Sequence, residues 1–198
     1  MKRTNYLGLC LLLVAIIVLW LLLSDPMQGT VKTLKETAVP DYVDVQLITV
    51  DGASRQGIPL EAVNGIVIHY VGNPGTSAKA NRGWFDNPES TVSSHFVVGL
   101  EGEVIQCVPL YEKSSASNHR NRDTISIEVC HPDDSGVFNE ATYRSLVKLT
   151  AWLVEVCQLE VEDVIRHYDV TGKECPRWFV RDEDAWMTFK NHVKEMCG

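Results

Sequence analysis

Residues 65–72 read GIVIHYVG, a continuous apolar run with a glycine at each end. Apolar side chains stand at successive positions and not only at alternate ones, so both faces of this strand are expected to be covered. A doubly covered strand lies in the middle of a sheet that has helices on its two sides. The run also carries one imidazole, His69, close to its end.

Four further stretches predict strands that would complete the sheet. Residues 94–100 and 103–108 are largely apolar and are joined by Glu101-Gly102, a signal for a hairpin turn. Residues 124–130 alternate, with apolar side chains on one face and polar ones on the other. A short strand is also expected at residues 164–167.

Helical patterns dominate the second half of the chain. Asn139 can cap a helix that runs to about residue 158, because the apolar residues there recur with the 3.6-residue period. A closing helix is expected at residues 181–196, with acidic residues in its first turn, and a shorter one at residues 76–85. This order predicts an α/β fold, a single domain with a central mixed β-sheet flanked by helices.

The N-terminus carries a different signal. Lys2 and Arg3 precede an uncharged apolar run of 17 residues, from position 7 to position 23. This length is at the short end of the roughly 17–25 residues that cross a bilayer. A signal peptide that is cleaved is the alternative, but no Ala-x-Ala-like site follows the run. We therefore expect a transmembrane helix that stays attached.

These segments define the expected organisation of the chain. Residues 1–23 form the membrane anchor, residues 24–45 a linker, and residues 46–198 the folded domain. Positive charge before the first span keeps the N-terminus inside, so the domain lies outside the cytoplasm. The predicted location is the cell membrane, with a single span; secretion after cleavage is the alternative.

The exported part is acidic, which limits its partners. Only 16 of the 18 Lys and Arg residues lie beyond position 23, against all 26 Asp and Glu residues, so the formal charge of residues 24–198 is −10. Nucleic acid is therefore not expected as a partner. We expect the protein to be a monomer.

Five of the six cysteines lie in the exported part. Cys175 is a candidate metal ligand. The other four could form two disulfides, one or none, and the sequence does not choose between these states. They are Cys107, Cys130, Cys157 and Cys197.

Three side chains can ligate a metal: His69, His167 and Cys175. Cys175 follows His167 by eight residues, and the loop between them contains a glycine, so it can fold back beside the imidazole. Two imidazoles and one thiolate suit zinc, and three protein ligands leave a fourth position for water. The spacing alone also allows a structural histidine and an ordinary buried thiol.

Several short strings, taken together, resemble a known family. They are IHY at 68–70, SSHFVV at 93–98, ISIEV at 125–129, RHYDVTGK at 166–173 and CP at 175–176. In this order they are similar to the type 2 N-acetylmuramoyl-L-alanine amidases, which are related to peptidoglycan recognition proteins and phage lytic amidases. The resemblance covers roughly residues 46–195.

The resemblance implies both a site and a reaction. His69, His167 and Cys175 match the zinc-ligand positions, Glu128 a catalytic acid position, and Lys173 a lysine close to the metal. The implied reaction is hydrolysis of the amide bond between N-acetylmuramic acid and L-alanine in peptidoglycan, with one zinc ion per domain. On this reading, Glu128 moves the proton and Lys173 assists the developing negative charge.

His119 is a candidate substrate-binding residue, because it lies in a polar loop before the strand that carries Glu128; a solvated loop residue is the alternative. Two other functions compete with the amidase. One is a peptidoglycan-binding receptor without catalysis, whose relatives commonly lack the thiolate ligand. The other is a structural zinc domain, which needs a fourth protein ligand such as His95, His119 or Cys130.

Overall fold

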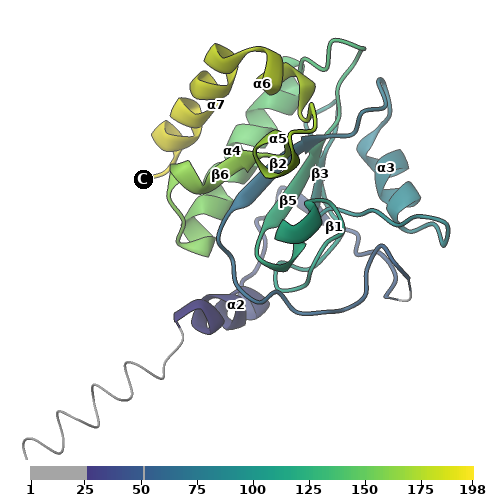
Figure 1. Cartoon of the computed structure of the whole chain (residues 1–198), viewed down its shortest axis with the longest axis vertical. Coiled ribbons are helices and arrows are strands. Elements are labelled where there is room, and N and C mark those ends of the chain that lie inside the picture. The colour runs from purple at the N-terminus through teal and green to yellow at the C-terminus, as the bar shows by residue number, and fades with distance from the viewer. Residues whose placement is uncertain (1–25, 51) are drawn as a thin grey trace, which may run out of the picture.

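The computed structural model describes residues 26–50 and 52–198 (Figure 1). The predicted anchor at residues 1–23 lies outside this part of the chain. Within the described residues, no helix combines the length and the apolar character needed to cross a membrane.

A six-stranded sheet forms the centre of the described domain, in the order β1-β4-β3-β5-β2-β6. Strand β2 pairs in parallel with β5 and β6, and β3 with β5, whereas β3 and β4 are antiparallel. The strands are β1 (Val43–Val45), β2 (Ile66–Tyr70), β3 (Phe96–Val98), β4 (Val104–Gln106), β5 (Ile125–Val129) and β6 (Val164–Arg166). The predicted central mixed sheet is confirmed, with strands shorter than expected at several ends.

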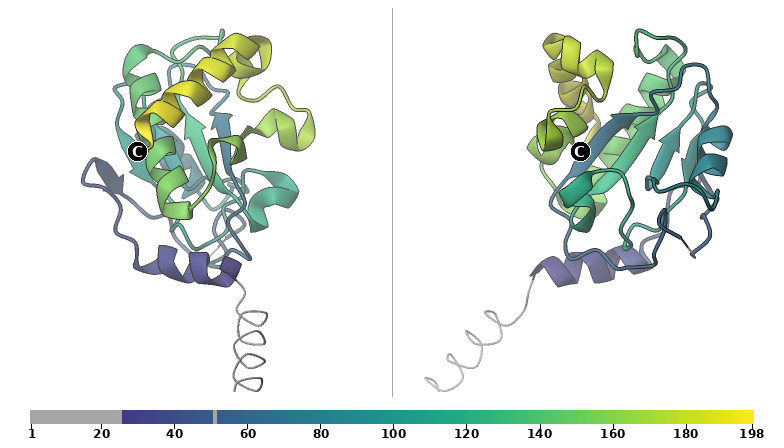
Figure 2. Two further views of the ribbon diagram at one scale, coloured as in Figure 1. Left: turned by 90° about the vertical axis from the view of Figure 1, so that its left-hand side faces the viewer. Right: turned by 45° about the vertical axis from the view of Figure 1, so that its right-hand side comes forward.

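Helices cover both faces of the sheet (Figures 1 and 2). Helices α4 and α7 pack together on one face, and α3 contacts β3 and β4 on the other. The α-helices are α2 (Pro26–Glu36), α3 (Ala78–Phe85), α4 (Glu140–Cys157), α5 (His167–Thr171), α6 (Arg177–Arg181) and α7 (Glu183–Met196); the 3-10 helices are η1 (Asn118–Arg122) and η2 (Val161–Asp163).

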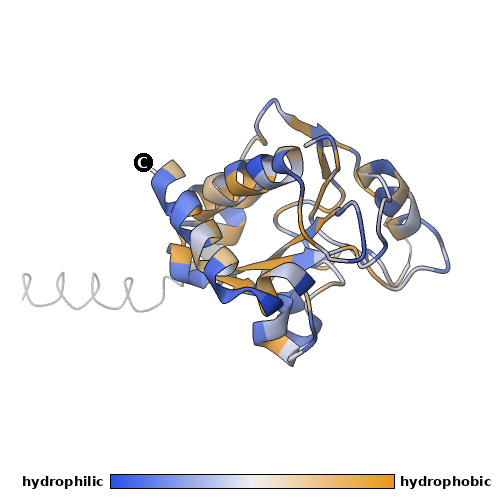
Figure 3. Ribbon diagram, turned by 90° about the horizontal axis from the view of Figure 1, so that it is seen from above, coloured by the Kyte–Doolittle hydropathy of each residue, from blue (hydrophilic) through white to orange (hydrophobic). Residues whose placement is uncertain are grey.

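The strands are doubly covered, as the apolar run predicts. In β3, Phe96 and Val98 belong to the large hydrophobic cluster beneath α4 and α7, whereas Val97 belongs to the smaller cluster beneath α3. In Figure 3, the strands are largely coloured hydrophobic, while the helices mix hydrophobic and hydrophilic residues. Each helix therefore buries one face only.

Local signals set the ends of the longer helices. The Asn139 side chain accepts a hydrogen bond from the Thr142 amide at the start of α4, as predicted. Asp182 accepts from the Ala185 amide, so the closing helix begins at Glu183 and not at Arg181. The preceding residues, 177–181, form the separate helix α6, which the sequence did not predict.

The expectation of an irregular linker at residues 24–45 is wrong where helix α2 and strand β1 form. Leu34 of α2 and Val43 of β1 are both buried in the main hydrophobic cluster. Burial of these apolar side chains stabilises the folded chain, whereas in a solvated tether they would remain exposed to water. The folded domain therefore begins earlier than residue 46.

The sheet brings the distant site residues to one edge. Strands β2, β5 and β6 are parallel, so their carboxyl ends meet. His69 of β2 lies directly opposite Glu128 of β5, and β6 ends at Arg166, immediately before His167. Residues far apart in the sequence thus become neighbours, as is usual at the carboxyl ends of parallel strands.

Candidate metal centre

His69, His167 and Cys175 converge at this edge. Their ligand atoms all lie within 4.8 Å of one another, and all three residues are buried. The two imidazole rings have centroids 4.6 Å apart. The Sγ atom of Cys175 lies 3.9 Å from Nδ1 of His69. In a tetrahedral site, zinc takes nitrogen ligands at about 2.0–2.1 Å and sulfur at about 2.3 Å, so a small approach of these atoms would suffice.

The loop after α5 places the thiol. Helix α5 ends at Thr171, and Gly172 adopts φ +77°, a left-handed conformation that suits glycine. The chain then folds back, so that the Tyr168 amide donates to the Cys175 carbonyl at 2.9 Å. The eight-residue spacing between His167 and Cys175 therefore closes into a compact loop beside the imidazole, as predicted.

Each imidazole has one ring nitrogen in a hydrogen bond, and its other ring nitrogen faces the proposed metal position. Nε2 of His69 lies 3.1 Å from Oγ of Ser117, and Nε2 of His167 lies 2.8 Å from Oδ1 of Asn118. Nδ1 of His167 is buried and has no hydrogen-bond partner. Two Nδ1 atoms and one sulfur thus form the available donor set, which is the softness and number that a catalytic zinc site uses.

The ionisation of the three side chains agrees with a ligand role. Burial lowers the pKa of His69 well below its usual value, with further lowering by His167 and Lys173. Burial, then Lys173, also lowers the pKa of His167. Both imidazoles are therefore neutral at pH 7, the form that binds a metal. Burial raises the pKa of the Cys175 thiol to about 12, so metal binding at neutral pH would release its proton.

No fourth protein ligand joins this set among the described residues. His95 is buried, and both of its ring nitrogens have hydrogen-bond partners in Ser126 and Glu112. His119 is exposed on η1. The Cys130 sulfur accepts from the Asn81 amide at 3.6 Å. The described residues therefore do not supply the closed coordination that a structural zinc site requires.

Glu128 lies beside the donor set with an unsatisfied carboxyl group. Its Oε2 atom is buried and has no hydrogen-bond partner. Burial raises the pKa of Glu128 to about 8, and the positive charge of Lys173 opposes this shift. A carboxyl group whose pKa is near neutrality can both accept and return a proton.

A cleft of about 430 Å³ opens onto these groups. Glu128 and Lys173 line it together with the three metal-capable side chains, and Lys173 is exposed. The other lining residues are Tyr70, Val71, Gly72, Phe85, Val92, Ser93, Ser115 and Ala116. His119 is not among the residues that line this cleft, so its predicted contact with substrate has no support from the cleft's shape.

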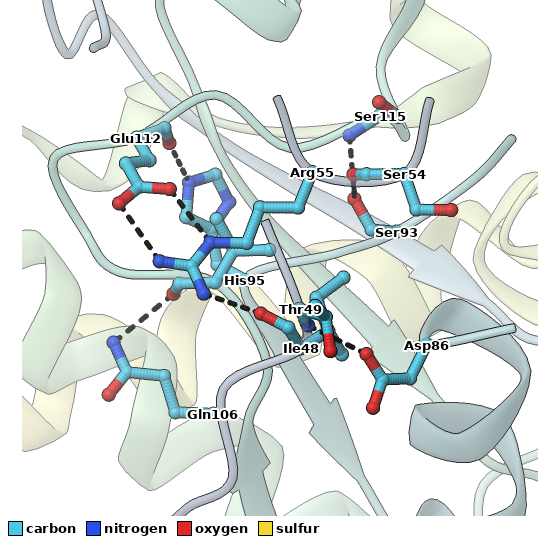
Figure 4. Close-up of polar contacts among 11 residues, drawn as sticks. Ile48, Thr49, Ser54, Arg55, Asp86, Ser93, His95, Gln106, Glu112 and Ser115 are labelled. Atoms are coloured by element: carbon cyan, nitrogen blue, oxygen red, sulfur yellow. Dashed lines mark hydrogen bonds and ion pairs between the residues drawn. The ribbon is translucent and has the colours of Figure 1, made fainter. Parts of the chain in front are cut away.

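The wall formed by Ser93 and Ser115 rests on a buried polar network (Figure 4). The Ser115 amide donates to Oγ of Ser93, whose hydroxyl donates to the Ser54 carbonyl. The adjacent Arg55 pairs with Glu112 through two contacts, at 2.8 and 3.0 Å. The segment that leads into the site is therefore anchored to the body of the domain.

Sequence reasoning missed two residues of the site, Ser117 and Asn118. Both lie in the same polar loop as His119. Their polar character places them in a loop, but which imidazole each one faces depends on the packing of α5 against η1. The five cysteines of the described part are all free thiols, which answers the question that the sequence left open.

Known proteins are similar to this chain in sequence and in fold. A family model described as N-acetylmuramoyl-L-alanine amidase matches residues 59–178. A probable N-acetylmuramoyl-L-alanine amidase of Bacillus licheniformis is 30% identical over 167 residues, which cover 76% of this chain and 47% of that protein. The N-acetylmuramoyl-L-alanine amidase BlyA of Bacillus subtilis (strain 168) is 30% identical over 176 residues, with the same coverage. The chain thus spans about half the length of these curated relatives.

Solved structures agree with the sequence matches. The catalytic domain of XlyA superimposes with a TM-score of 0.67 at 27% identity, and the match covers 76% of this chain and 98% of that one. A mutant endolysin from Bacillus subtilis gives a TM-score of 0.68 at 28% identity, covering 76% and 97%. The family expected from the short motifs is confirmed: this chain belongs to the N-acetylmuramoyl-L-alanine amidase family.

Proposed function

We propose that this protein is a zinc-dependent amidase that hydrolyses the bond between N-acetylmuramic acid and L-alanine in peptidoglycan. The observation that carries the proposal is the buried set of two imidazoles and one thiol, open to a cleft beside the unpartnered carboxyl group of Glu128. The names of the relatives supply the substrate class.

His69, His167 and Cys175 would hold the zinc ion in this proposal. The chemistry available at such a donor set is polarisation of an amide carbonyl and acidification of a water molecule. The cleft offers space for a substrate next to these ligands, and its walls include apolar residues such as Phe85 and Val92.

Glu128 is the proposed proton carrier. Its carboxylate accepts a proton from the attacking water and returns it to the leaving nitrogen, so the amine departs neutral. Burial, opposed by the charge of Lys173, raises its pKa to about 8, and a bound cation would lower that value toward neutral pH. The lack of another partner for Oε2 leaves the carboxyl group free for this task.

Lys173 is the proposed electrostatic partner. Its exposed ammonium group lines the cleft and lowers the pKa of both His69 and His167, which places its charge close to the reacting centre. A fixed positive charge there stabilises the oxyanion that forms on the carbonyl oxygen. The contribution is smaller than that of a buried charge, because solvent screens it.

We further propose, from the charge and hydropathy pattern of residues 1–23, that the enzyme is tethered to a membrane, and the position of α2 suggests how the domain would then be oriented. The ammonium group of Lys35 lies 5.7 Å from the Tyr111 ring, and Tyr111 accepts a hydrogen bond from Leu60, shortly before β2 begins. The metal centre lies at the other end of β2. Figure 1 shows α2 at one end of the domain, so a tether that precedes it would point the cleft away from the membrane. Membrane fractionation of the full chain, with and without residues 1–23, tests this location.

The amidase itself is tested on purified peptidoglycan. We expect the protein to contain one zinc ion and to release free L-alanine amino termini, and we expect removal of the metal to abolish this release. A receptor without catalysis would bind the wall and release nothing. Full cleavage by a preparation that contains no zinc would refute the mechanism.

A further inference from the structure

Two neighbouring residues contact the two imidazoles on the side that faces away from the donor set. Oγ of Ser117 lies 3.1 Å from Nε2 of His69, and Oδ1 of Asn118 lies 2.8 Å from Nε2 of His167. Ser117 is fully buried. One turn of the chain thus reaches both histidines, although one lies in strand β2 and the other at the start of helix α5.

The chemistry of an amide oxygen decides the direction of the second hydrogen bond. This oxygen can only accept, so Nε2 of His167 must carry the proton and donate it to Asn118. In a neutral ring, Nδ1 then has a lone pair and no hydrogen. That atom is the one that is buried without a partner, next to Cys175 and His69.

We propose that Asn118 is a positioning residue that selects Nδ1 of His167 as its metal-binding atom, while the hydroxyl of Ser117 holds the ring of His69. This proposal rests on the zinc site proposed above and adds residues that act through the ligands. Ligand histidines commonly donate their second N–H to a polar partner, which fixes the tautomer and the ring orientation. Here the partners are a neutral amide and a hydroxyl.

The turn is built to hold these two side chains in place. Oδ1 of Asn121 accepts from the amides of Ala116 and Ser117, at 3.0 and 2.5 Å. Asn118 itself has φ +55°, in the left-handed region that asparagine tolerates better than most residues. Helix η1, which starts at Asn118, packs against α5, which starts at His167. The contact is therefore part of the fold and does not depend on a bound ion.

A matched pair of variants tests the proposal. Asn118→Gly removes the amide and keeps the left-handed backbone without strain, whereas Asn118→Asp restores an acceptor at the same place. Arg122→Ala is the control, because Arg122 lies on the same 3-10 helix and is exposed like Asn118, but it pairs with Glu61 and not with a histidine. Zinc affinity of the full chain is measured by competition with a chelator. The tautomer of His167 in the metal-free chain is read by NMR with 15N-labelled histidine, and His167→Gln assigns its signal.

We expect Asn118→Gly to weaken zinc binding by about 10–100-fold. We expect Asn118→Asp and Arg122→Ala to bind zinc as the parent does. The metal-free parent should show His167 protonated at Nε2, and Asn118→Gly should lose this preference. A parent protonated at Nδ1, or an Asn118→Gly variant that binds zinc as tightly as the parent, would overturn the inference. Loss of zinc binding by Asn118→Asp would overturn it as well.

These results separate this inference from the proposed function. If the parent binds zinc and cleaves peptidoglycan while His167 is protonated at Nδ1, only the positioning role fails. If the parent binds no zinc at all, the proposed amidase mechanism fails first, and the tautomer of the metal-free chain still reports on the contact with Asn118.

Discussion

Two buried polar clusters of similar size lie in this domain, and they differ in how completely their atoms are paired. The first, which we term the scaffold network, consists of Arg55, Glu112, His95 and Ser126. The guanidinium group of Arg55 also donates to the Ile48 carbonyl at 2.5 Å (Figure 4). The Ser126 amide donates to Nδ1 of His95 at 3.0 Å. No side-chain atom of this network is left without a partner.

The second cluster is the metal centre with Glu128. Here Oε2 of Glu128 and Nδ1 of His167 are both buried and unpaired. An unpaired buried polar group costs roughly 1–3 kcal/mol of stability, so a fold retains such groups where they serve a ligand or a reaction. The comparison teaches that the scaffold network is fully paired, whereas the candidate metal centre with Glu128 keeps two unpaired polar atoms; the other unpaired atoms among the described residues, of Tyr42, His131 and Thr150, lie outside it.

The largest effect is expected from a substitution that removes one of the three proposed metal ligands. Cys175→Ala removes the sulfur ligand, so we expect zinc content to fall from one ion per chain to background, and cleavage of peptidoglycan to fall with it. Metal analysis and release of L-alanine amino termini measure the two losses. Cys197→Ala is the control, since that cysteine lies at the end of α7, is only partly buried and does not belong to the donor set. Cleavage by Cys175→Ala at the parent rate would remove the basis of the comparison.

The next effect separates chemistry from metal binding. Glu128→Gln keeps the shape of the side chain and removes its ability to accept a proton. We expect the turnover rate to fall by about 10²–10⁴-fold, with zinc content unchanged. Turnover and metal content are measured on the same preparation. A variant that stays nearly as active as the parent would show that another group carries the proton.

In the scaffold network, the expected effect is on stability. Glu112→Gln leaves the buried Arg55 charge without its ion partner, so we expect the free energy of unfolding to fall by about 3–5 kcal/mol. Glu61→Gln, which breaks an exposed pair with Lys113, should cost less than about 1 kcal/mol. Denaturant titration measures both. Equal losses in the two variants would contradict the distinction between buried and exposed pairs.

The last expected effect, no larger than that of the buried ion pair, is the pH dependence caused by His95. Burial lowers the pKa of His95 to about 4, while its hydrogen bond to the Glu112 carbonyl opposes the shift. As the pH falls, His95 therefore takes up a proton near pH 6.5 in the unfolded chain, and only near pH 4 in the folded chain. Stability from this residue is present above pH 6.5 and is lost as the pH falls toward 4, by on the order of 3 kcal/mol.

His95→Gln tests this dependence, because glutamine does not titrate. We expect the variant to be less stable than the parent at pH 7, since it loses the bonds to Ser126 and Glu112. We also expect its stability to fall less than that of the parent between pH 7 and pH 4. Unfolding curves at a series of pH values provide the measurement, and parallel pH profiles for the two proteins would contradict the assignment.

The sequence by itself determined the features that depend on local pattern. The apolar run at residues 66–70 is a central strand, and Asn139 caps α4, because burial on both faces and helix capping leave a direct trace in neighbouring residues. The motifs around His69, Glu128 and His167 also indicated the family. Helix α2 was missed because its few apolar side chains, such as Leu34, become informative only once a partner surface exists.

The tertiary structure alone decided how these pieces combine. Parallel pairing places His69 opposite Glu128, although 59 positions separate them in the chain, and no local period encodes such a register. The approach of Asn118 to His167 and the unpaired state of Glu128 likewise follow from packing between distant segments. Local residues fix backbone conformation and burial, whereas distances between donor atoms and the pKa of a buried carboxyl group depend on everything packed around them.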